Sequence, residues 1–193
     1  MTYSLALFPL QTVIFPGGLL PLRVFEPRYM DMVTQAIADR AAFGICAIRE
    51  GRDIDVAAKH YSVGTCVKVI DWDMPQPGIL HIQTQALERF VVRSSHSEPS
   101  GLRIGEVDEV SPEPAIALPE ELTLSAEVLY QIINQLGADK FAPPHDYSNA
   151  TWVSYRLSEV LPLKLSVRQN LLEMNDSVAR LTILTDFLKK QTN

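Results

Sequence analysis

Apolar and polar positions alternate with a period of two through much of the chain before residue 110, and glycine or proline separates the runs. Such alternation is typical of strands with one buried face. Residues 5–8 and 19–25 are apolar enough to be buried strands. Between them, Pro16 and Gly17 predict a turn, because proline fixes φ and glycine accepts a positive φ.

A long β-hairpin is predicted next. Residues 61–69 alternate strictly, residues 79–93 alternate again, and the intervening 74–78 contain two prolines and a glycine that interrupt the pattern. Residues 102–110 predict a last strand. This part of the chain therefore reads as a β-sheet built from local hairpins and short turns.

One segment of the sheet region has helical spacing instead. Met30, Val33 and Ile37 recur three and four residues apart, and Pro27 suits a first helical turn because its missing N–H has no partner to lose there. We expect a helix that ends near Asp39, with its apolar stripe on the sheet and its polar side chains toward water.

The proline-rich residues 111–119 divide the chain, since proline continues neither a central strand nor a helix interior. Beyond them the apolar period becomes helical from Leu122 to Leu136, and Gly137 predicts the C-cap. Three more helices are expected: one around Trp152 that stops near Pro162, one started by a capping box of Ser166 and Gln169, and one over residues 178–188. The fold class is α+β, with a β-rich subdomain over 1–113 and a helical subdomain over 119–193.

Composition agrees with a folded globular chain, because 47% of the residues are hydrophobic and 21% are charged. The net charge is −6, and no basic run exceeds Lys189-Lys190. Nucleic-acid binders need a cluster of basic residues to displace counterions. We therefore expect neither nucleic acid nor an anionic membrane as a partner.

Location and redox state follow from what the sequence lacks. No apolar run approaches the ~20 residues that span a bilayer, and the first residues lack the basic segment of a signal peptide. We expect a cytoplasmic protein. Cys46 and Cys66 lie among apolar, β-branched neighbours, which predicts buried thiols that pack as small hydrophobes and form no disulfide.

The chain contains no recognisable catalytic motif. A phosphate-binding loop needs a Gly-Lys pair, which is absent, as are Gly-x-Ser-x-Gly and His-Glu-x-x-His. The four histidines are too dispersed for a metal site. The acid pairs Asp53/Asp55 and Asp71/Asp73 flank predicted turns, where we expect them to be solvated. No catalytic residue, metal or cofactor is predicted.

Several ordered motifs spread over nearly the whole chain resemble the N-terminal domain of Lon protease. Those near the start are Leu7-Phe8-Pro9-Leu10, Phe15-Pro16-Gly17, Pro21-Leu22-Arg23 and Phe25-Glu26-Pro27-Arg28-Tyr29. Later ones are Tyr61-Ser62-Val63-Gly64-Thr65, Leu87-Glu88-Arg89-Phe90, Leu161-Pro162-Leu163, Leu171-Leu172 and Asn175-Asp176.

The resemblance implies a PUA-like β-barrel or twisted sheet followed by a helical bundle, and a role in recognising substrate polypeptides. Full-length Lon also carries an ATPase module and a protease module with a Ser–Lys dyad, and no residue here matches either. Among the motif residues we expect Leu22 and Phe25 in the core, and Arg28 either paired with a carboxylate such as Glu26 or capping a carbonyl.

Two groups of residues are candidates for binding a polypeptide. The first is the hairpin tip, where an aromatic and a flexible thioether lie beside a turn: Trp72, Met74, Pro75, Pro77 and Ile79. Trp72 has an alternative role in closing the end of the barrel. The second group, Phe141, Tyr147 and Trp152, is expected between the subdomains, with interdomain packing as the alternative.

The sequence therefore predicts a non-catalytic polypeptide-recognition module that acts as an adaptor or scaffold for substrate proteins, with a separate protease as one possible partner. It leaves open a monomer or a small homo-oligomer. The alternatives are a PUA-like domain that binds RNA or a small ligand, and a hydrolase with an unrecognised site assembled across the fold.

Overall fold

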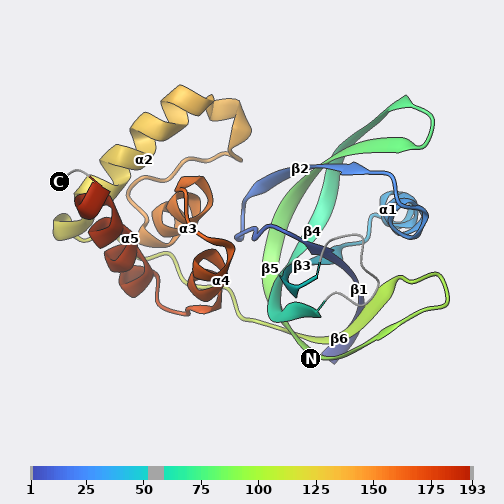
Figure 1. Ribbon diagram of the computed structural model, residues 1–193. Coiled ribbons are helices and arrows are strands. Elements are labelled where there is room, and N and C mark those ends of the chain that lie inside the picture. The colour runs from blue at the N-terminus through green and yellow to red at the C-terminus, as the bar shows by residue number, and fades with distance from the viewer. Residues whose placement is uncertain (1, 52–58, 192–193) are drawn as a thin grey trace. The chain divides into compact units, whose positions relative to one another are not determined.

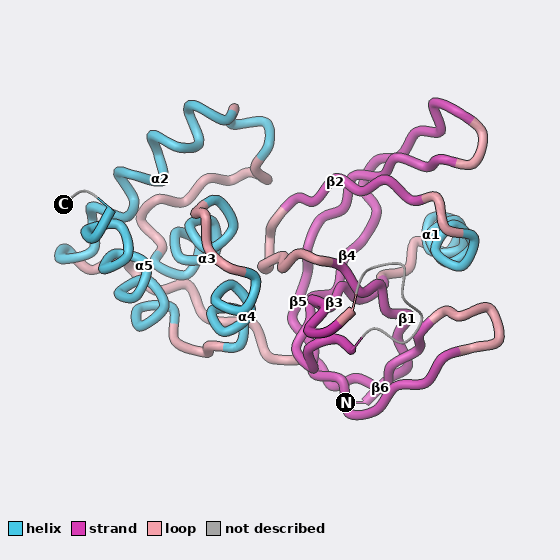
Figure 2. The backbone as a smooth tube through the Cα atoms, in the orientation of Figure 1, coloured by secondary structure: helices cyan, strands magenta, loops and turns pink. Residues whose placement is uncertain are grey.

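The computed structural model describes residues 2–51 and 59–191 (Figures 1 and 2). The chain divides into two compact units, Met1–Ser111 and Pro112–Asn193. The first unit is a sheet with one helix and the second is helical (Figure 2), so the α+β class predicted from the sequence is confirmed. Asp53 and Asp55 lie outside the described residues.

The first unit is a mixed six-stranded sheet that curls into a near-barrel. Its strands run in the order β2-β5-β4-β3-β1-β6, and β5 also pairs with β6, which closes the ring. Among the described strands, only the pair of β1 and β3 is parallel. The elements are β1 (Thr2–Leu10), β2 (Leu19–Val24), α1 (Pro27–Asp39), β3 (Phe43–Glu50), β4 (Lys59–Gln76), β5 (Ile79–Ser97) and β6 (Arg103–Glu109).

Strand β5 is long enough to pair with two strands, one after the other, on the edge opposite β4. Its first half pairs with β2 and its second half with β6, so β2 extends the sheet without belonging to the closed ring. Inside the ring Phe90 is fully buried, and the sheet leaves room for its ring at two glycines. A Cβ placed on Gly44 or Gly64 would lie 2.6 Å from Cζ of Phe90. These close approaches require glycine at both positions.

Helix α1 covers a second apolar cluster on the same sheet. Tyr29, Met32, Val33 and Ala36 are buried and pack with residues of β1, β3, β4 and β5, and Phe8 stacks on Tyr29 with ring centroids 4.0 Å apart. The helix has the bounds that the sequence predicts. Its buried stripe is shifted from the predicted one, because Met30 and Ile37 lie at the stripe's edge and are only partly buried.

Several local expectations for the first unit are confirmed. The turn before β2 forms as predicted, with Gly17 at φ 76° and a hydrogen bond from the N–H of Gly18 to the carbonyl of Phe15. Arg28 forms an ion pair with Glu26 at 2.8 Å and donates to the carbonyl of Gly101 at 3.1 Å. Both free cysteines are buried.

Three expectations for the first unit are wrong. Phe25 is not a core residue; it is 60% exposed because β2 ends at Val24 and the chain turns into α1. Strand β4 does not break at residue 74 but continues through Pro75 to Gln76, since it is paired only with β5 there and loses no second partner. Asp71 and Asp73 accordingly lie within a strand and not beside a turn, although both are exposed to solvent as expected.

The second unit contains α2 (Thr123–Leu136), α3 (Ala150–Val160), α4 (Leu165–Glu173) and α5 (Ser177–Gln191), with 3-10 turns η1 (Glu120–Leu122) and η2 (Ala138–Lys140). Gly137 ends α2 at φ 103°, as predicted. The predicted capping box is wrong: Lys164 is the N-cap of α4, Ser166 lies inside the helix, and buried Gln169 donates to Glu173 at 2.8 Å.

A buried ion pair joins the start of the second unit to its last helix. The guanidinium of Arg180 is fully buried and binds both carboxylate oxygens of Glu113. It also donates to the carbonyls of Leu171 at 2.8 Å and Met174 at 2.7 Å, and to Oγ of Ser154 at 3.0 Å. Burying such a charge is tolerated only when its donors are satisfied, and here the surrounding acceptors meet that need.

Candidate functional site

The end of the β4–β5 hairpin is a three-stranded extension of the sheet formed by β2, β5 and β4. Strand β3 pairs with β4 only as far as Val67, whereas β5 accompanies β4 up to Gln76. Within the described strands, the other edge of β4 beyond Val67 therefore has no pairing strand. Unpaired strand edges are where an extended polypeptide can add to a sheet.

Large apolar side chains on this segment of β4 are exposed. Ile70, Trp72 and Met74 are 47%, 55% and 46% accessible, respectively. The register of β4 against β5 shifts between Val69 and Asp71, which places Ile70 at an irregularity of the strand. Clustered exposed apolar residues are uncommon on a folded surface unless they contact something.

Trp72 lies on the side of the sheet that α1 covers. It pairs with Ile82 of β5, and cross-strand partners point to the same face. Ile82 is buried in the cluster under α1, whereas Trp72 lies beyond the reach of the helix. The backbone N–H of Trp72 donates to Oδ1 of Asp71 at 2.9 Å.

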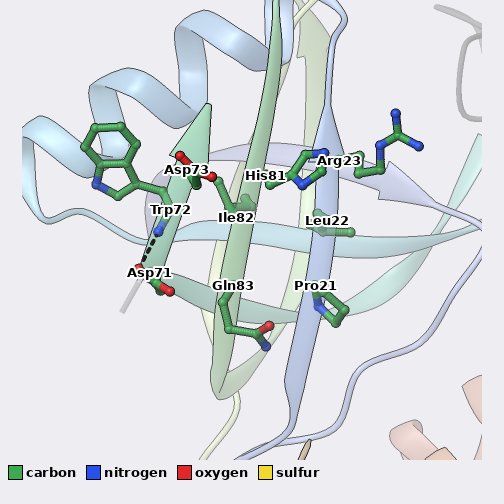
Figure 3. Close-up of a pocket in the computed structure, with 9 residues that line it drawn as sticks. All are labelled: Pro21, Leu22, Arg23, Asp71, Trp72, Asp73, His81, Ile82 and Gln83. Carbon is green, nitrogen blue, oxygen red and sulfur yellow. Dashed lines mark hydrogen bonds between the residues drawn. The ribbon is translucent and has the colours of Figure 1, made fainter. Parts of the chain in front are cut away.

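The opposite face of the extension is polar. Three cross-strand rows lie side by side in Figure 3, and the first and last of them point to this opposite face. The rows are Asp73, His81 and Arg23; Trp72, Ile82 and Leu22; and Asp71, Gln83 and Pro21. These residues line an open hollow of about 440 Å³. The first and last rows supply its charged and amide groups, so this hollow offers hydrogen-bonding groups beside the apolar edge.

A second hollow, which we call the notch, lies on the α1 side where the helix ends beside β4. It also measures about 440 Å³, and its lining comes from the last turn of α1, the connection to β3 and the unpaired part of β4. The residues are Ala36, Ile37, Arg40, Ala41, Lys68, Val69, Ile70 and Trp72. Trp72 thus borders both hollows.

The remaining predicted residues of the hairpin tip occupy its turn. Pro75 and Pro77 are exposed, and half-buried Ile79 pairs with Gln76 across the turn at Pro77 and Gly78. Sequence reasoning missed Ile70, because strict alternation assigned no special position to a residue at a strand irregularity. It also missed Arg40 and Lys68, whose place beside Trp72 depends on the packing of α1.

The second predicted group lies within the helical unit. Tyr147 contacts Trp152 edge to face with centroids 5.1 Å apart, and His145 joins them to Phe141, which is buried. Tyr130 of α2 also meets Tyr147 at 5.5 Å. Tyr130 and Tyr147 line a shallow hollow of about 550 Å³ with Ala126, Glu127 and Gln131.

Of the described residues with a clearly shifted pKa, Tyr147 lines one of these hollows, and burial raises its pKa. Burial raises the pKa of both cysteine thiols, so neither thiol is ionised at neutral pH, and Tyr3 lies 3.5 Å from Sγ of Cys66. Among residues 2–51 and 59–191, no group of three or more side chains is arranged to hold a metal ion. No helix in that part of the chain is long and apolar enough to cross a membrane.

The near-barrel with its extended hairpin, followed by a helical unit, defines an α+β fold in which one group of exposed apolar side chains follows a strand edge. The chain belongs to the family of the ATP-dependent protease La (LON) substrate-binding domain, whose model matches residues 4–190. The family resemblance seen in the sequence motifs is therefore confirmed.

Two solved structures are similar over almost their whole length. A Lon N-terminal domain protein from Xanthomonas campestris is 34% identical, with a TM-score of 0.78 over 95% of this chain and 98% of the other. The N-terminal domain of a Mycobacterium avium complex Lon protease has a TM-score of 0.64 over 95% of this chain and 97% of the other. At 16% identity the second match supports the fold alone.

Two full-length relatives carry the same region within much longer chains. Lon protease of Anaeromyxobacter dehalogenans is 24% identical and Lon protease 2 of Myxococcus xanthus is 23% identical, each over 97% of this chain. The chain spans about a quarter of the length of these relatives, 23% and 24% respectively.

Proposed function

We propose that this chain is a non-catalytic module that binds extended or unfolded polypeptide segments and acts as an adaptor for substrate proteins. The observation that carries the proposal is the exposed apolar row of Ile70, Trp72 and Met74 on a strand segment with one unpaired edge. Unfolded segments offer groups that fit this surface, namely backbone groups that can pair with the strand edge and large apolar side chains that can pack on the exposed row.

The composition of the surface suits ligands of varied sequence. Trp72 supplies a rigid aromatic contact, and tryptophan is among the residues that contribute most to binding energy at interfaces. Met74 is unbranched and adapts its shape to different apolar partners. Backbone pairing along an edge depends little on side-chain identity. These properties favour broad recognition of polypeptides over recognition of one small ligand.

Family membership supports the same role. The family is named for substrate binding in an ATP-dependent protease, and a separate protease is accordingly a partner that we propose for the captured polypeptide. We also propose that the chain works in the cytoplasm, as a monomer or a small homo-oligomer, and needs no cofactor.

The proposal is tested by fluorescence anisotropy with a labelled, permanently unfolded protein such as reduced, carboxymethylated α-lactalbumin. Replacing both Trp72 and Met74 by alanine removes the two largest exposed side chains of the hairpin end. If each contributes about 1 kcal/mol, affinity falls by more than about tenfold. Both side chains are about half exposed, so the double variant retains its fold, which circular dichroism verifies.

Ile183→Ala is the matched control, because Ile183 is 50% exposed on α5 in the other unit. We expect this variant to bind like the parent protein. Equal binding by the parent and the Trp72→Ala, Met74→Ala variant would show that the hairpin end is not the binding surface. Absence of binding by the parent protein would remove the proposed function itself.

A further inference from the structure

The notch beside Trp72 combines an apolar wall with two positive charges. Ile37, Ile70 and Trp72 supply the wall, and Arg40 and Lys68 are exposed at its border. Within residues 2–51 and 59–191, neither of these two cations forms an ion pair. Both charges are therefore free to meet an anionic group of a ligand.

Several hydrogen-bond acceptors lie near the notch, and each has a donor within the chain. At the end of α1 the carbonyl of Ala36 accepts from the N–H of Ala41 at 2.9 Å, and that of Ile37 accepts from the N–H of Arg40 at 3.3 Å. The carboxylate of Asp39 accepts from the side-chain amide of Gln35 at 2.6 Å. Asp71 of β4 accepts from the N–H of Trp72 and lines the hollow on the opposite face of the sheet. Arg40 and Lys68 are the charged residues among those that line the notch itself.

The direction of the neighbouring strand decides which end of a ligand reaches these cations. Strand β3 runs antiparallel to β4 and starts at Phe43, which pairs with Val67. A segment that pairs with β4 beyond Val67 would lie where β3 would run if it were extended backwards from Phe43. If it runs in the direction of β3, its C-terminus arrives at the notch, and it stops there because β3 and the end of α1 occupy the space beyond.

The opposite direction is disfavoured by charge. A segment parallel to β4 would bring its N-terminal ammonium group next to Arg40 and Lys68, and like charges at this distance repel. A C-terminal carboxylate in the same place gains two oppositely charged neighbours and a hydrogen-bonding guanidinium. The apolar wall then faces the last side chains of the segment.

We propose that the notch binds the free C-terminal carboxylate of a polypeptide whose last residues add as a strand to the unpaired edge of β4, antiparallel to it. Arg40 and Lys68 hold the carboxylate, and Ile37, Ile70 and Trp72 receive an apolar side chain at the end of the ligand. This inference rests on the proposed function, since it names which part of the polypeptide the hairpin end recognises.

Two fluorescein-labelled peptides of the same short sequence test the inference, one with a free C-terminal carboxylate and one with a C-terminal amide. The sequence alternates valine and threonine and ends in leucine, which favours an extended strand. Anisotropy titrations should show roughly fivefold tighter binding of the free acid, as expected for surface ion pairs, and a smaller preference at raised NaCl.

Charge-neutralised variants assign the preference to the notch. In the Arg40→Gln, Lys68→Gln variant the two peptides should bind equally well, each at about the affinity of the amide for the parent protein. Arg23→Gln is the matched control, because Arg23 is an exposed cation of the same sheet extension that lines the opposite hollow. This control should keep the preference for the free acid.

The outcomes separate the two proposals. Equal binding of both peptides to the parent protein, with both weakened by Trp72→Ala, overturns carboxylate recognition and leaves polypeptide binding intact. Preference for the free acid that survives in Arg40→Gln, Lys68→Gln also overturns the notch assignment. Absence of binding by either peptide, and by the unfolded protein probe as well, overturns both proposals.

Discussion

Removing the carboxylate of Glu113 should strongly destabilise the helical unit. Glu113 is the anionic partner of Arg180, and their side chains are 4% and 0% exposed. In Glu113→Ala the guanidinium keeps its bonds to the carbonyls of Leu171 and Met174 and to Ser154, but it loses its only ion-pair partner among the described residues. Tyr155, which donates to Glu113 at 2.7 Å, loses an acceptor as well.

The magnitude follows from the cost of an unpaired buried charge. Breaking a buried ion pair by removing one partner costs about 3–5 kcal/mol, and the three remaining acceptors favour the lower end of that range. Glu113→Gln keeps an acceptor oxygen and should cost less, about 1–2 kcal/mol. With a urea dependence of about 1–3 kcal/mol/M, the alanine variant should lower the unfolding midpoint by at least about 1 M.

Urea unfolding monitored by tryptophan fluorescence measures the effect on the correct unit. The chain has two tryptophans, so a Trp72→Phe background leaves Trp152 of α3 as the only reporter. Glu127→Ala is the control, because Glu127 is an exposed acid on α2 whose loss should change stability by less than about 0.5 kcal/mol. The reasoning is refuted if Glu113→Ala costs no more than this control.

Two further predictions concern the first unit. Gly44→Ala and Gly64→Ala should each lower the free energy of unfolding by about 1–3 kcal/mol through overpacking, measured by thermal denaturation. Phe90→Leu should partly rescue Gly44→Ala, whose close contacts are all side-chain atoms, but not Gly64→Ala, whose Cβ would also lie 2.5 Å from the carbonyl oxygen of Ile45; equal rescue would contradict this account. Burial lowers the pKa of His60 in the folded chain below its usual value. As the pH falls through about 6.5, the imidazole therefore takes up a proton in the unfolded chain before it does so in the folded one, and the free energy of unfolding should decrease. Urea midpoints between pH 7.5 and pH 5.5 should therefore change less in His60→Gln than in the parent protein, and parallel changes would contradict the role of His60.

Most elements were predictable because they depend on local chemistry. The bounds of α1, the turn at Gly17 and the C-cap at Gly137 follow from proline, glycine and apolar spacing, and each is confirmed. Strand β3 (Phe43–Glu50) was missed because its residues 43–48 are buried on both faces, so the apolar run over them lacks a period of two. Its partner β1 is also distant in sequence, with Phe8 paired to Ile45.

The errors at single residues have the same origin. Phe25 follows an apolar run that looks like a buried strand, but the strand ends one residue earlier and leaves the ring in solvent. Ser166 and Gln169 have the spacing of a capping box, yet the helix begins at Leu165, so Ser166 lies too late to cap it. In both cases the position of an element boundary, and not the residue type, decided the outcome.

The sequence by itself determined the fold class, the change from strands to helices after residue 110 and the family resemblance, and it named the hairpin tip around Trp72 as a candidate surface. The exposure of Trp72 came from the structure. Only the tertiary structure decided that β3 leaves β4 at Val67, that Arg40 and Lys68 border the same hollow as Trp72, and that Glu113 reaches Arg180 across 67 residues of sequence. Periodicity, turns and caps are set by neighbouring residues, whereas strand order and side-chain partners depend on contacts between distant segments that no local pattern encodes.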